Sequence, residues 1–371
     1  MRVMLTGGGT AGHINPALAI ARYVRKRRPS AEIQFVGATG GMEEKLVAKA
    51  GFDLKTYRVS GISRSFTPKA VLENVRAAAR LAAAMHSAGK LIDEFKPDIV
   101  IGTGGFASFP AVRSAAKRGI PTLIHESNVM PGKTNKQLAS CCTHVLVCSE
   151  DTLEHFAQRE KCIVTGNPLR DGMVFTEKAE AKAALGIHCP LVYSAWGSLG
   201  AKEMNRMTAE LFALEQKNGS PFKHIHSTGS YGYQWMPDLV KELGVDLEND
   251  PNIDMREYVF DAPAVMAAAD ITLCRAGAMT MSEVCATGTP AIIVPSPNVT
   301  DDHQRYNARS LSDRGAAIYL EEAEATPERV FGLINELLSD PERLEKIRSA
   351  ALNMAIFDAT ERIYDIICKY V

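Results

Sequence analysis

The sequence predicts an α/β fold made of two doubly wound domains in tandem that face a central cleft. The chain has 371 residues, which is too long for one ordinary hydrophobic core. Short apolar strands alternate with helical stretches, and many of these strands run into glycine-rich turns, as in βαβ units. This pattern ends near residue 165 and restarts after a proline-containing segment.

The segment Gly166-Asn-Pro-Leu-Arg170 is the predicted hinge between the domains. Pro168 has a fixed φ and keeps Asn167 extended, so the segment does not continue a helix. We therefore expect one domain over residues 1–165 and a second over residues 166–371. A last helix, at about 358–370, has apolar residues at helical spacing and is able to pack on either domain.

The first domain is expected to contain a parallel sheet with strands at residues 3–6, 32–36, 98–102, 121–124, 144–148 and 162–165. A glycine turn follows the first strand, and a helix is expected to begin near Pro16. The run Gly7-x-Gly9-x-x-Gly12 matches a dinucleotide fingerprint, but the second strand ends without an acidic residue for an adenosine ribose. The turn therefore predicts close approach of backbone to a phosphate and argues against an NAD site.

Three loops with small or hydrogen-bonding residues follow strands of this sheet. They are the turn 7–12, the turn 103–108, and the segment 125–135 that begins His125-Glu-Ser-Asn128. Because the carboxyl ends of parallel strands share one edge, these loops should gather there. Such convergence is typical of a binding site.

In the second domain, strands are predicted at residues 191–195, 223–229, 253–259, 270–274 and 291–295. Helices are expected from residue 201 onward and at residues 263–269 and 278–287. Gly288 stands where helices commonly end.

The segment 270–304 is the most informative part of the second domain. The N-terminal amides of its helix should point toward the carboxyl edge of the sheet, which suits a phosphate. Glu283 lies on the face of Met279, where a carboxylate is able to accept both hydroxyls of a ribose. Gln304 has an amide that donates and accepts, which suits a sugar ring. A solvated surface glutamate is the plain alternative for Glu283.

The composition, with 23% charged and 46% hydrophobic residues, is that of an ordinary globular protein. No apolar run approaches the roughly 18 residues that span a bilayer, and the N-terminus lacks a signal-peptide pattern. The eight cysteines include no Cys-x-x-Cys pair, and we expect Cys274 and Cys285 to be small core residues. These features predict a cytosolic protein.

The net charge of −1 hides an asymmetry between the two halves. Residues 1–165 hold 23 Lys+Arg and 13 Asp+Glu, or +10, whereas residues 166–371 hold 19 and 30, or −11. The basic half suits an anionic partner such as a membrane surface or a pyrophosphate.

The segment 275–308 also carries a resemblance to a known family. It contains Arg-Ala-Gly-Ala-Met-Thr-Met-Ser-Glu-Val, then Gly-Thr-Pro-Ala, then Asp-Asp-His-Gln-Arg-Tyr-Asn-Ala. This run closely resembles the UDP-sugar site of the MurG family, and the similarity covers nearly the whole chain. The resemblance implies a GT-B type glycosyltransferase with paired Rossmann-like domains. It implies inverting transfer of N-acetylglucosamine from UDP-N-acetylglucosamine to the muramyl C4 hydroxyl of lipid I, giving lipid II at the inner face of the membrane.

The resemblance also implies roles for individual residues. Those expected to approach the donor sugar are Thr10, Ala11, Gly12, Asn128 and Gln304. Those expected near the diphosphate, the uracil and the ribose are Arg170, Ser198, Val259, Ala278, Met279, Thr280, Met281, Ser282 and Glu283. His13 lies next to the acceptor and is the candidate general base or acceptor-orienting group, with His125-Glu126 in reserve. A histidine that only packs the glycine loop is the alternative.

One position departs from the family pattern. Trp196 precedes Gly197-Ser198 where the family has glycine, and a tryptophan beside the cleft would narrow it or move Ser198. No cluster of His, Asp or Cys has metal-ligand spacing, so we expect metal-independent chemistry without a cofactor.

Two other classes of function stay open at this point. A UDP-N-acetylglucosamine 2-epimerase has a similar fold and the same nucleotide, but it needs no basic, membrane-facing half and requires carboxylates that exchange protons. A non-catalytic sugar-nucleotide binder would not need His13 beside three converging loops. Nucleic acid is not an expected partner.

The stretch 64–80 is the candidate membrane-binding segment. Pro68 suits the first position of a helix. Val71, Leu72 and Val75 then share one face, and basic residues flank it: Lys69, Arg76 and Arg80. An ordinary amphipathic helix packed on its own domain is the alternative. Together with the charge of +10 and a lipid acceptor, this helix predicts peripheral association with the cytoplasmic face of the membrane.

Overall fold

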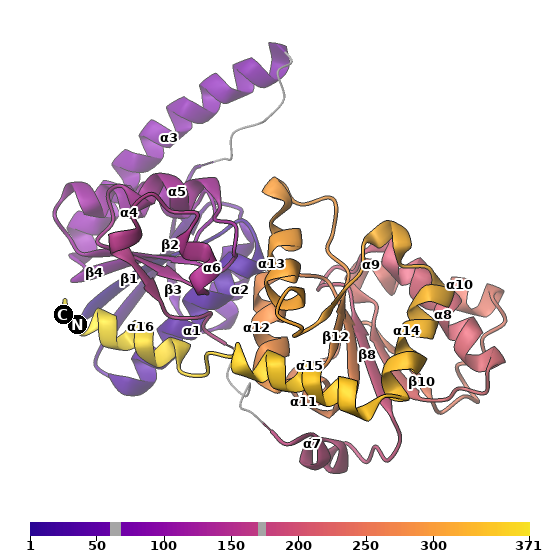
Figure 1. Cartoon of the computed structure of the whole chain (residues 1–371). Coiled ribbons are helices and arrows are strands. Elements are labelled where there is room, and N and C mark those ends of the chain that lie inside the picture. Colours follow the sequence, from indigo (N-terminus) through magenta and orange to yellow (C-terminus); the bar gives the residue numbers. More distant parts are fainter. Residues whose placement is uncertain (60–67, 170–175) are drawn as a thin grey trace. The chain divides into compact units, whose positions relative to one another are not determined.

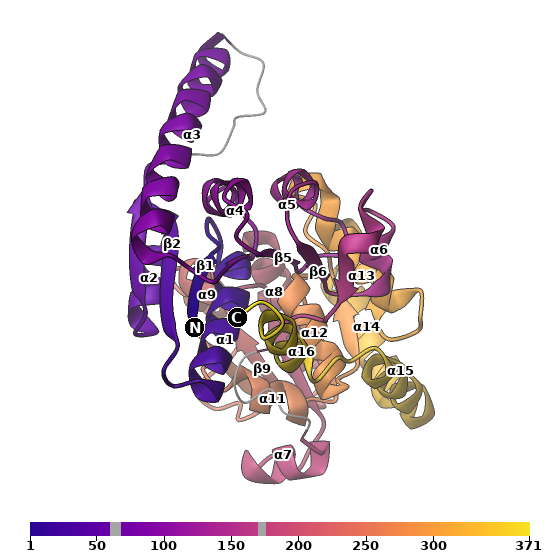
Figure 2. The same ribbon diagram turned by 90° about the vertical axis from the view of Figure 1, so that its left-hand side faces the viewer.

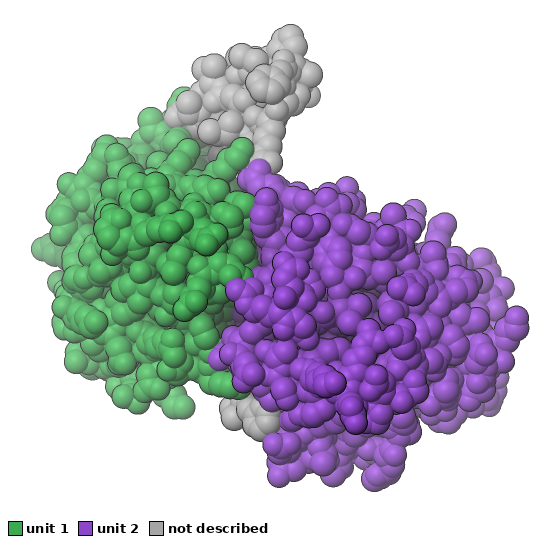
Figure 3. Space-filling view, in the orientation of Figure 1, with its two compact units in different colours: residues 1–171, 356–371 green, residues 172–355 purple. Residues whose placement is uncertain are grey.

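The computed structural model describes residues 1–59, 68–169 and 176–371, with the side chains of residues 68–78 outside the description. The chain forms two compact units (Figure 3): unit 1 is Met1–Asp171 with Ile356–Val371, and unit 2 is Gly172–Ala355. The division falls at Asp171/Gly172, close to the predicted boundary of 165/166. The final segment, which the sequence left open between the domains, lies in unit 1.

Unit 1 contains a parallel sheet (Figure 1), and in its described part the strand order is β3-β2-β1-β4-β5-β6-β7. The strands are β1 (Arg2–Thr6), β2 (Glu32–Ala38), β3 (Asp53–Tyr57), β4 (Ile99–Gly102), β5 (Thr122–Glu126), β6 (His144–Val147) and β7 (Cys162–Val164). The helices are α1 (Ala11–Arg27), α2 (Met42–Lys49), α3 (Pro68–Phe95), α4 (Ser108–Lys117), α5 (Lys133–Ala139), α6 (Glu150–Leu153) and α16 (Ala359–Ile367), with a 3₁₀ turn at Arg159–Lys161.

Unit 2 repeats this arrangement, with the parallel strand order β10-β9-β8-β11-β12-β13. The strands are β8 (Leu191–Ala195), β9 (Lys223–Ser227), β10 (Ile253–Arg256), β11 (Ile271–Cys274), β12 (Ala291–Ile293) and β13 (Ile318–Tyr319). The helices are α7 (Lys178–Ala184), α8 (Lys202–Lys217), α9 (Gly229–Gly232), α10 (Met236–Glu242), α11 (Ala262–Ala268), α12 (Ala278–Thr287), α13 (His303–Ser312), α14 (Pro327–Leu338) and α15 (Pro341–Asn353), with 3₁₀ turns at Thr300–Asp302 and Glu322–Glu324.

Each sheet is buried on both faces because side chains alternate along its strands. In β1, Val3 and Leu5 belong to a core cluster with Ile14 of α1, whereas Met4 belongs to another cluster on the opposite face. Helix α16 adds Ile363 to the α1 side, and Figures 1 and 2 both show α16 beside α1. The last helix therefore completes the core of unit 1.

The predicted α/β fold with two doubly wound sheets is confirmed, but several element bounds are wrong. Helix α1 begins at Ala11, not near Pro16, and Pro16 lies inside it. The edge strands β3 and β13 were missed because β3 is mostly polar and β13 spans two residues. His125 and Glu126 are the last residues of β5 instead of the start of a loop.

Each sheet has a topological switch point beside the first strand of its unit, because successive strands are added first on one side of that strand and then on the other. The loops after β1 and β4 are neighbours in unit 1, and those after β8 and β11 are neighbours in unit 2. Ligands of doubly wound sheets bind at the carboxyl edge of such switch points. The topology therefore indicates the loops after β1 and β4, and those after β8 and β11, as the expected binding loops. These loops include the glycine turns that the sequence singled out.

No helix in the described ranges has the length and apolar character required to cross a membrane. The expectation that Cys274 and Cys285 are core residues is confirmed, because both are buried. Burial raises the pKa of each thiol to about 12.

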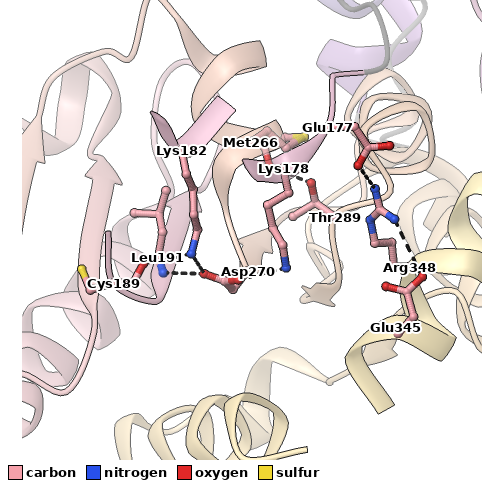
Figure 4. A network of polar contacts seen from close by, with 10 residues as sticks. All are labelled: Glu177, Lys178, Lys182, Cys189, Leu191, Met266, Asp270, Thr289, Glu345 and Arg348. Carbon is pink, nitrogen blue, oxygen red and sulfur yellow. Dashed lines mark hydrogen bonds and ion pairs between the residues drawn. The ribbon is translucent and has the colours of Figure 1, made fainter. Parts of the chain in front are cut away.

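A polar network at the amino edge of the unit 2 sheet anchors α7 (Figure 4). The Asp270 carboxylate accepts hydrogen bonds from Lys178 Nζ at 3.0 Å, Lys182 Nζ at 2.5 Å and Leu191 N at 2.8 Å. Burial alone would raise the pKa of Asp270, but these hydrogen bonds and the charge of Lys178 outweigh it and lower the pKa. The network stabilises the start of β11, on the edge opposite the switch-point loops.

We expect Asp270→Asn to lower the melting temperature of unit 2, with a loss of about 2 kcal/mol at neutral pH. Because the folded pKa of Asp270 is depressed, its contribution is present above the unfolded pKa and is lost as the pH falls through the folded pKa. In melting curves from pH 7 to pH 3, the difference between wild type and variant should therefore become smaller toward the acid end. Asp238→Asn, at an exposed position of α10, is the control. A difference independent of pH would contradict the charge-based explanation.

Candidate functional site

The first two glycine loops of unit 1 pack directly against each other at the carboxyl edge of the sheet. A Cβ on Gly105 would stand 2.1 Å from the carbonyl oxygen of Gly8, and Gly105 has φ +78°. Gly8 N also lies 3.4 Å from Gly104 O. Because these positions tolerate no side chain, the two loops form one rigid backbone surface.

His13 lies in the first turn of α1, above the second glycine loop. Its Nδ1 is 3.2 Å from the carbonyl oxygen of Thr103, and Thr103 Oγ1 donates to His13 O at 2.6 Å. A carbonyl only accepts, so Nδ1 carries the proton and Nε2 is the basic nitrogen. A Cβ on residue 104 would stand 2.7 Å from His13 Nδ1, so the glycine at this position also makes room for the imidazole.

Glu126 is buried and holds the loop that follows β5. Its Oε1 accepts from Asn128 N at 3.0 Å and Asn128 Nδ2 at 3.1 Å. Its Oε2 accepts from Gly132 N at 3.0 Å and Asn135 Nδ2 at 2.9 Å. A carboxylate with four donors already in place is suited to orienting Asn128 and the loop around it.

His125 is fully buried beside this loop. Its Nε2 lies 3.1 Å from Gly166 O, and its Nδ1 lies 3.3 Å from Ser127 Oγ. Burial lowers the pKa of His125, which keeps the imidazole neutral. This histidine therefore connects β5 to the loop at Gly166.

The remaining unit 1 residues of the predicted site stand at the start of α1. Thr10 is the extended N-cap residue, and Ala11, Gly12 and His13 form the first turn. Pro16 has no N–H, so the carbonyl of Gly12 receives no helical hydrogen bond from that position. The loop thus presents both backbone donors and a backbone acceptor, a combination that suits a sugar.

In unit 2, α12 begins at Ala278 directly after the β11 turn. Its N-cap, Gly277, makes no side-chain capping bond, and Gly288 ends the helix with φ 63°, as predicted. Asn307 of α13 donates to Ala276 O at 3.0 Å and fixes the turn from the other side. The helix start is therefore held by its neighbours and keeps its dipole directed at the carboxyl edge.

The residues of α12 divide between surface and core. Ala278, Met279 and Thr280 are half-buried, and Ser282 Oγ donates to Ala278 O at 3.3 Å. The Met281 side chain is part of the hydrophobic core, so only its backbone is available to a ligand. Glu283 is 5% exposed, which excludes a solvated surface glutamate.

The Trp196 side chain is buried in the core of unit 2, so the expectation that it narrows a cleft was wrong. It is 3% exposed, belongs to the core of unit 2, and donates from Nε1 to Thr208 Oγ1 at 2.9 Å. Its ring lies 6.0 Å from the guanidinium carbon of Arg275. Arg275 also pairs with Glu322 and donates to Val294 O at 3.1 Å, so it connects the ends of several strands.

The other predicted unit 2 positions spread along the same edge. Ser198 is exposed in the loop after β8, and Val259 is buried just after β10. Gln304, at the start of α13, accepts from Ser296 N through Oε1 at 2.8 Å. Strands β10 and β11 are three strand spacings apart, or about 14 Å, which suits an extended nucleotide sugar.

Sequence reasoning missed four residues that support these loops: Glu43, Asn135, Arg275 and Asn307. Each is polar and buried or nearly so, and each bonds to backbone or to a predicted site residue. Asn135 and Asn307 stand within segments that the sequence marked, but their hydrogen bonds to Glu126 and Ala276 depend on how those segments fold. Only the folded structure reveals such contacts.

Part of the prediction lies outside the described residues. Arg170 is one such position, and the side chains of Lys69, Val71, Leu72, Val75 and Arg76 are others. Arg80 is exposed on α3, and Pro68 is the first residue of that helix, as predicted. Within the described ranges, no group of three or more His, Cys, Asp or Glu side chains is arranged to hold a metal ion.

Comparison with known proteins matches both units. Residues 3–147 match the glycosyltransferase family 28 N-terminal domain, and residues 192–367 match the glycosyltransferase family 28 C-terminal domain. A UDP-N-acetylglucosamine–N-acetylmuramyl-(pentapeptide) pyrophosphoryl-undecaprenol N-acetylglucosamine transferase of Acetivibrio thermocellus is 40% identical over 369 residues, covering 99% of this chain and 97% of the relative.

Solved structures agree with this assignment. The crystal structure of Acinetobacter baumannii MurG has a TM-score of 0.74 at 28% identity, covering 99% of both chains. A UDP-GlcNAc 2-epimerase from Neisseria meningitidis, covering 100% of both chains, has a TM-score of 0.66 at 16% identity, which shows a shared fold alone. The paired domain matches and the full-length identity show that the chain belongs to glycosyltransferase family 28 and, within it, to the MurG family of N-acetylglucosamine transferases.

Proposed function

We propose that the protein transfers N-acetylglucosamine from UDP-N-acetylglucosamine to the C4 hydroxyl of the muramyl sugar of lipid I, giving lipid II and UDP. The transfer inverts the anomeric configuration because the hydroxyl displaces UDP directly. The observation that carries the proposal is the full-length similarity to the Acetivibrio transferase, whose name states both the transferred sugar and the acceptor.

The unit 1 loops are assigned to the acceptor hydroxyl and the donor sugar. His13 Nε2 takes the proton from the C4 hydroxyl as its oxygen bonds to the anomeric carbon. Support comes from the Thr103 carbonyl, which fixes the proton on Nδ1, and from the rigid glycine loops beneath the ring. Asn128, oriented by Glu126, is placed to hydrogen-bond the sugar.

The unit 2 edge is assigned to the nucleotide. The start of α12 stabilises the negative charge that develops on the leaving diphosphate, together with Ser198 and Arg170. Glu283 accepts the ribose hydroxyls, the Val259 backbone contacts uracil, and Gln304 donates to the sugar. This assignment requires no metal ion, because the helix start supplies the stabilising field.

The test is incubation with UDP-N-acetylglucosamine, with and without a lipid I analogue. Formation of the disaccharide lipid and of UDP only when the acceptor is present supports the proposal. An epimerase would form a 2-epimer of the donor without acceptor, and a binding protein would form neither product. Addition of EDTA should leave the transfer rate unchanged if the reaction is metal-independent.

We also propose that unit 1 docks on anionic lipid at the cytoplasmic face of the membrane through the first half of α3. The second half of this helix packs on its own unit through Ala84, Ala88 and Ile92. Ala79 and Arg80, at the end of the first half, are exposed. The charge of +10 over residues 1–165 and a lipid-linked acceptor support this assignment.

A variant with Lys69, Arg76 and Arg80 all changed to Glu should lose most of its binding to anionic vesicles. Each basic residue near such a surface contributes about 1 kcal/mol, and the attraction weakens as salt rises. Sedimentation with vesicles of anionic lipid at low and high salt measures both effects. The matched control reverses Lys217, Lys241 and Arg329, three exposed residues of unit 2. Equal vesicle binding by the α3 variant and wild type would place the membrane surface elsewhere.

A further inference from the structure

A buried carboxylate lies beneath the first glycine loop of unit 1. Glu43 is the second residue of α2 and is only 1% exposed. Its Oε1 accepts a hydrogen bond from Ala38 N at 2.8 Å, and its Oε2 lies 3.4 Å from Gly9 N. A buried charge of this kind is costly unless the protein supplies partners, so its position calls for an explanation.

The backbone around Glu43 has no room for side chains. A Cβ on Gly8 would stand 2.3 Å from Glu43 Oε1, and one on Gly41 would stand 2.4 Å from Oε2. A Cβ on Gly37 would stand 2.8 Å from the Glu43 Cγ. Glycines from three segments therefore close around one carboxylate, which fills the space under the loop.

Gly8 and Gly9 are held from two sides. Glu43 contacts them from below, and the second glycine loop contacts them through Gly104 and Gly105. The residues that follow immediately are Thr10, Ala11, Gly12 and His13. Glu43 therefore contacts the loop directly before the start of α1 and its histidine.

A glutamate in the first turn of a helix commonly stabilises that helix through its dipole. That explanation accounts for an acidic residue at this position. It does not account for the orientation of the Glu43 side chain, because the carboxylate contacts backbone amides of β2 and of the loop after β1. Its neighbour Glu44 shows the ordinary arrangement: it is exposed and accepts from Gly40 N at 2.8 Å. Of these two adjacent glutamates, Glu43 contacts the first glycine loop, whereas Glu44 contacts only the turn before its own helix.

We propose that Glu43 is a positioning residue for the transfer reaction, which holds the first glycine loop so that His13 and the backbone of Thr10–Gly12 meet the acceptor and the donor sugar. The inference rests on the proposed function. It assigns to α2 a part in catalysis that acts through the loop, without contact between Glu43 and either substrate.

The test compares Glu43→Gln with Glu44→Gln, using UDP-N-acetylglucosamine and a lipid I analogue. Glutamine has nearly the same shape but replaces one carboxylate oxygen with a donor, so the loop loses one acceptor. We expect Glu43→Gln to lower kcat between about tenfold and a hundredfold, since small displacements of reacting groups have effects of this size. The KM for the acceptor should rise, whereas the Kd for UDP, which binds unit 2, should stay within about twofold.

Glu44→Gln should match wild type in all three quantities. Melting temperatures of both variants establish that unit 1 is folded. Unchanged kcat in Glu43→Gln would overturn the proposal, and so would loss of UDP binding or of folding together with turnover, because Glu43 would then be a general structural residue. Absence of transfer by wild type would instead refute the proposed function itself.

Discussion

Replacement of His13 by alanine should lower kcat at least about a hundredfold, which is the usual loss when a general base is removed. The affinity for UDP should not change, because the nucleotide is assigned to unit 2. The structure supplies the physical reason, since the carbonyl of Thr103 accepts from Nδ1 and leaves Nε2 as the basic nitrogen. Steady-state kinetics with saturating donor and acceptor measure the first quantity, and calorimetric titration with UDP measures the second.

His188→Ala is the matched control for this prediction. His188 is exposed and precedes β8 at the amino edge of the unit 2 sheet, away from either switch point. Its removal should leave kcat and UDP affinity as in wild type. If His13→Ala retains most of the turnover, His13 only packs the glycine loop, and the proton acceptor must be sought elsewhere.

Replacement of Glu283 by alanine should weaken UDP binding by about 2–3 kcal/mol, or roughly 30-fold to 150-fold. The effect should appear in the donor KM, with little change in the acceptor KM. Glu283 is 5% exposed, so the substitution removes a buried carboxylate from the helix that meets the nucleotide. Glu328→Ala, an exposed glutamate in the first turn of α14, should change donor binding by no more than about 0.5 kcal/mol.

A buried glutamate is also able to act only by stabilising its helix, and 2′-deoxy-UDP separates the two roles. If Glu283 binds the ribose hydroxyls, wild type should bind 2′-deoxy-UDP more weakly than UDP. The variant should show a smaller preference for UDP over 2′-deoxy-UDP. Removal of the carboxylate and removal of the 2′-hydroxyl both abolish the same interaction, so their effects on binding do not add. An equal preference for UDP in both proteins would show that Glu283 does not contact the ribose.

The alternation of apolar strands with glycine turns was sufficient to predict both sheets, because buried parallel strands are short and almost wholly apolar. Leu191–Ala195 was predicted with its observed bounds. The edge strand Asp53–Tyr57 was missed because three of its five residues are exposed and it lacks an apolar run. Pro16 misled the prediction of α1, since a proline within a helix is rarer than one at its start.

The site was predicted less completely than the fold. Motif residues such as Glu283 and Gln304 stand in one continuous segment, and their spacing was informative. Many supporting contacts join segments far apart in the sequence, as between Thr103 and His13, and no local pattern reveals them. The burial of Trp196 was likewise invisible, because its partner Thr208 lies on the following helix and only packing turns the indole inward.

The return of the chain to unit 1 at Ile356 has a consequence for the order of folding during synthesis. Unit 2 is a continuous segment, Gly172–Ala355, and is complete on the ribosome before α16 is made. Until then the apolar side of α1 lacks Ile363, Tyr364 and Ile367, which cover it in the finished protein. Domains generally fold as units when their residues have emerged. The unit that is translated first therefore cannot complete its core until the last residues of the chain have been made, and until then its α1 face is exposed to chaperones and to self-association.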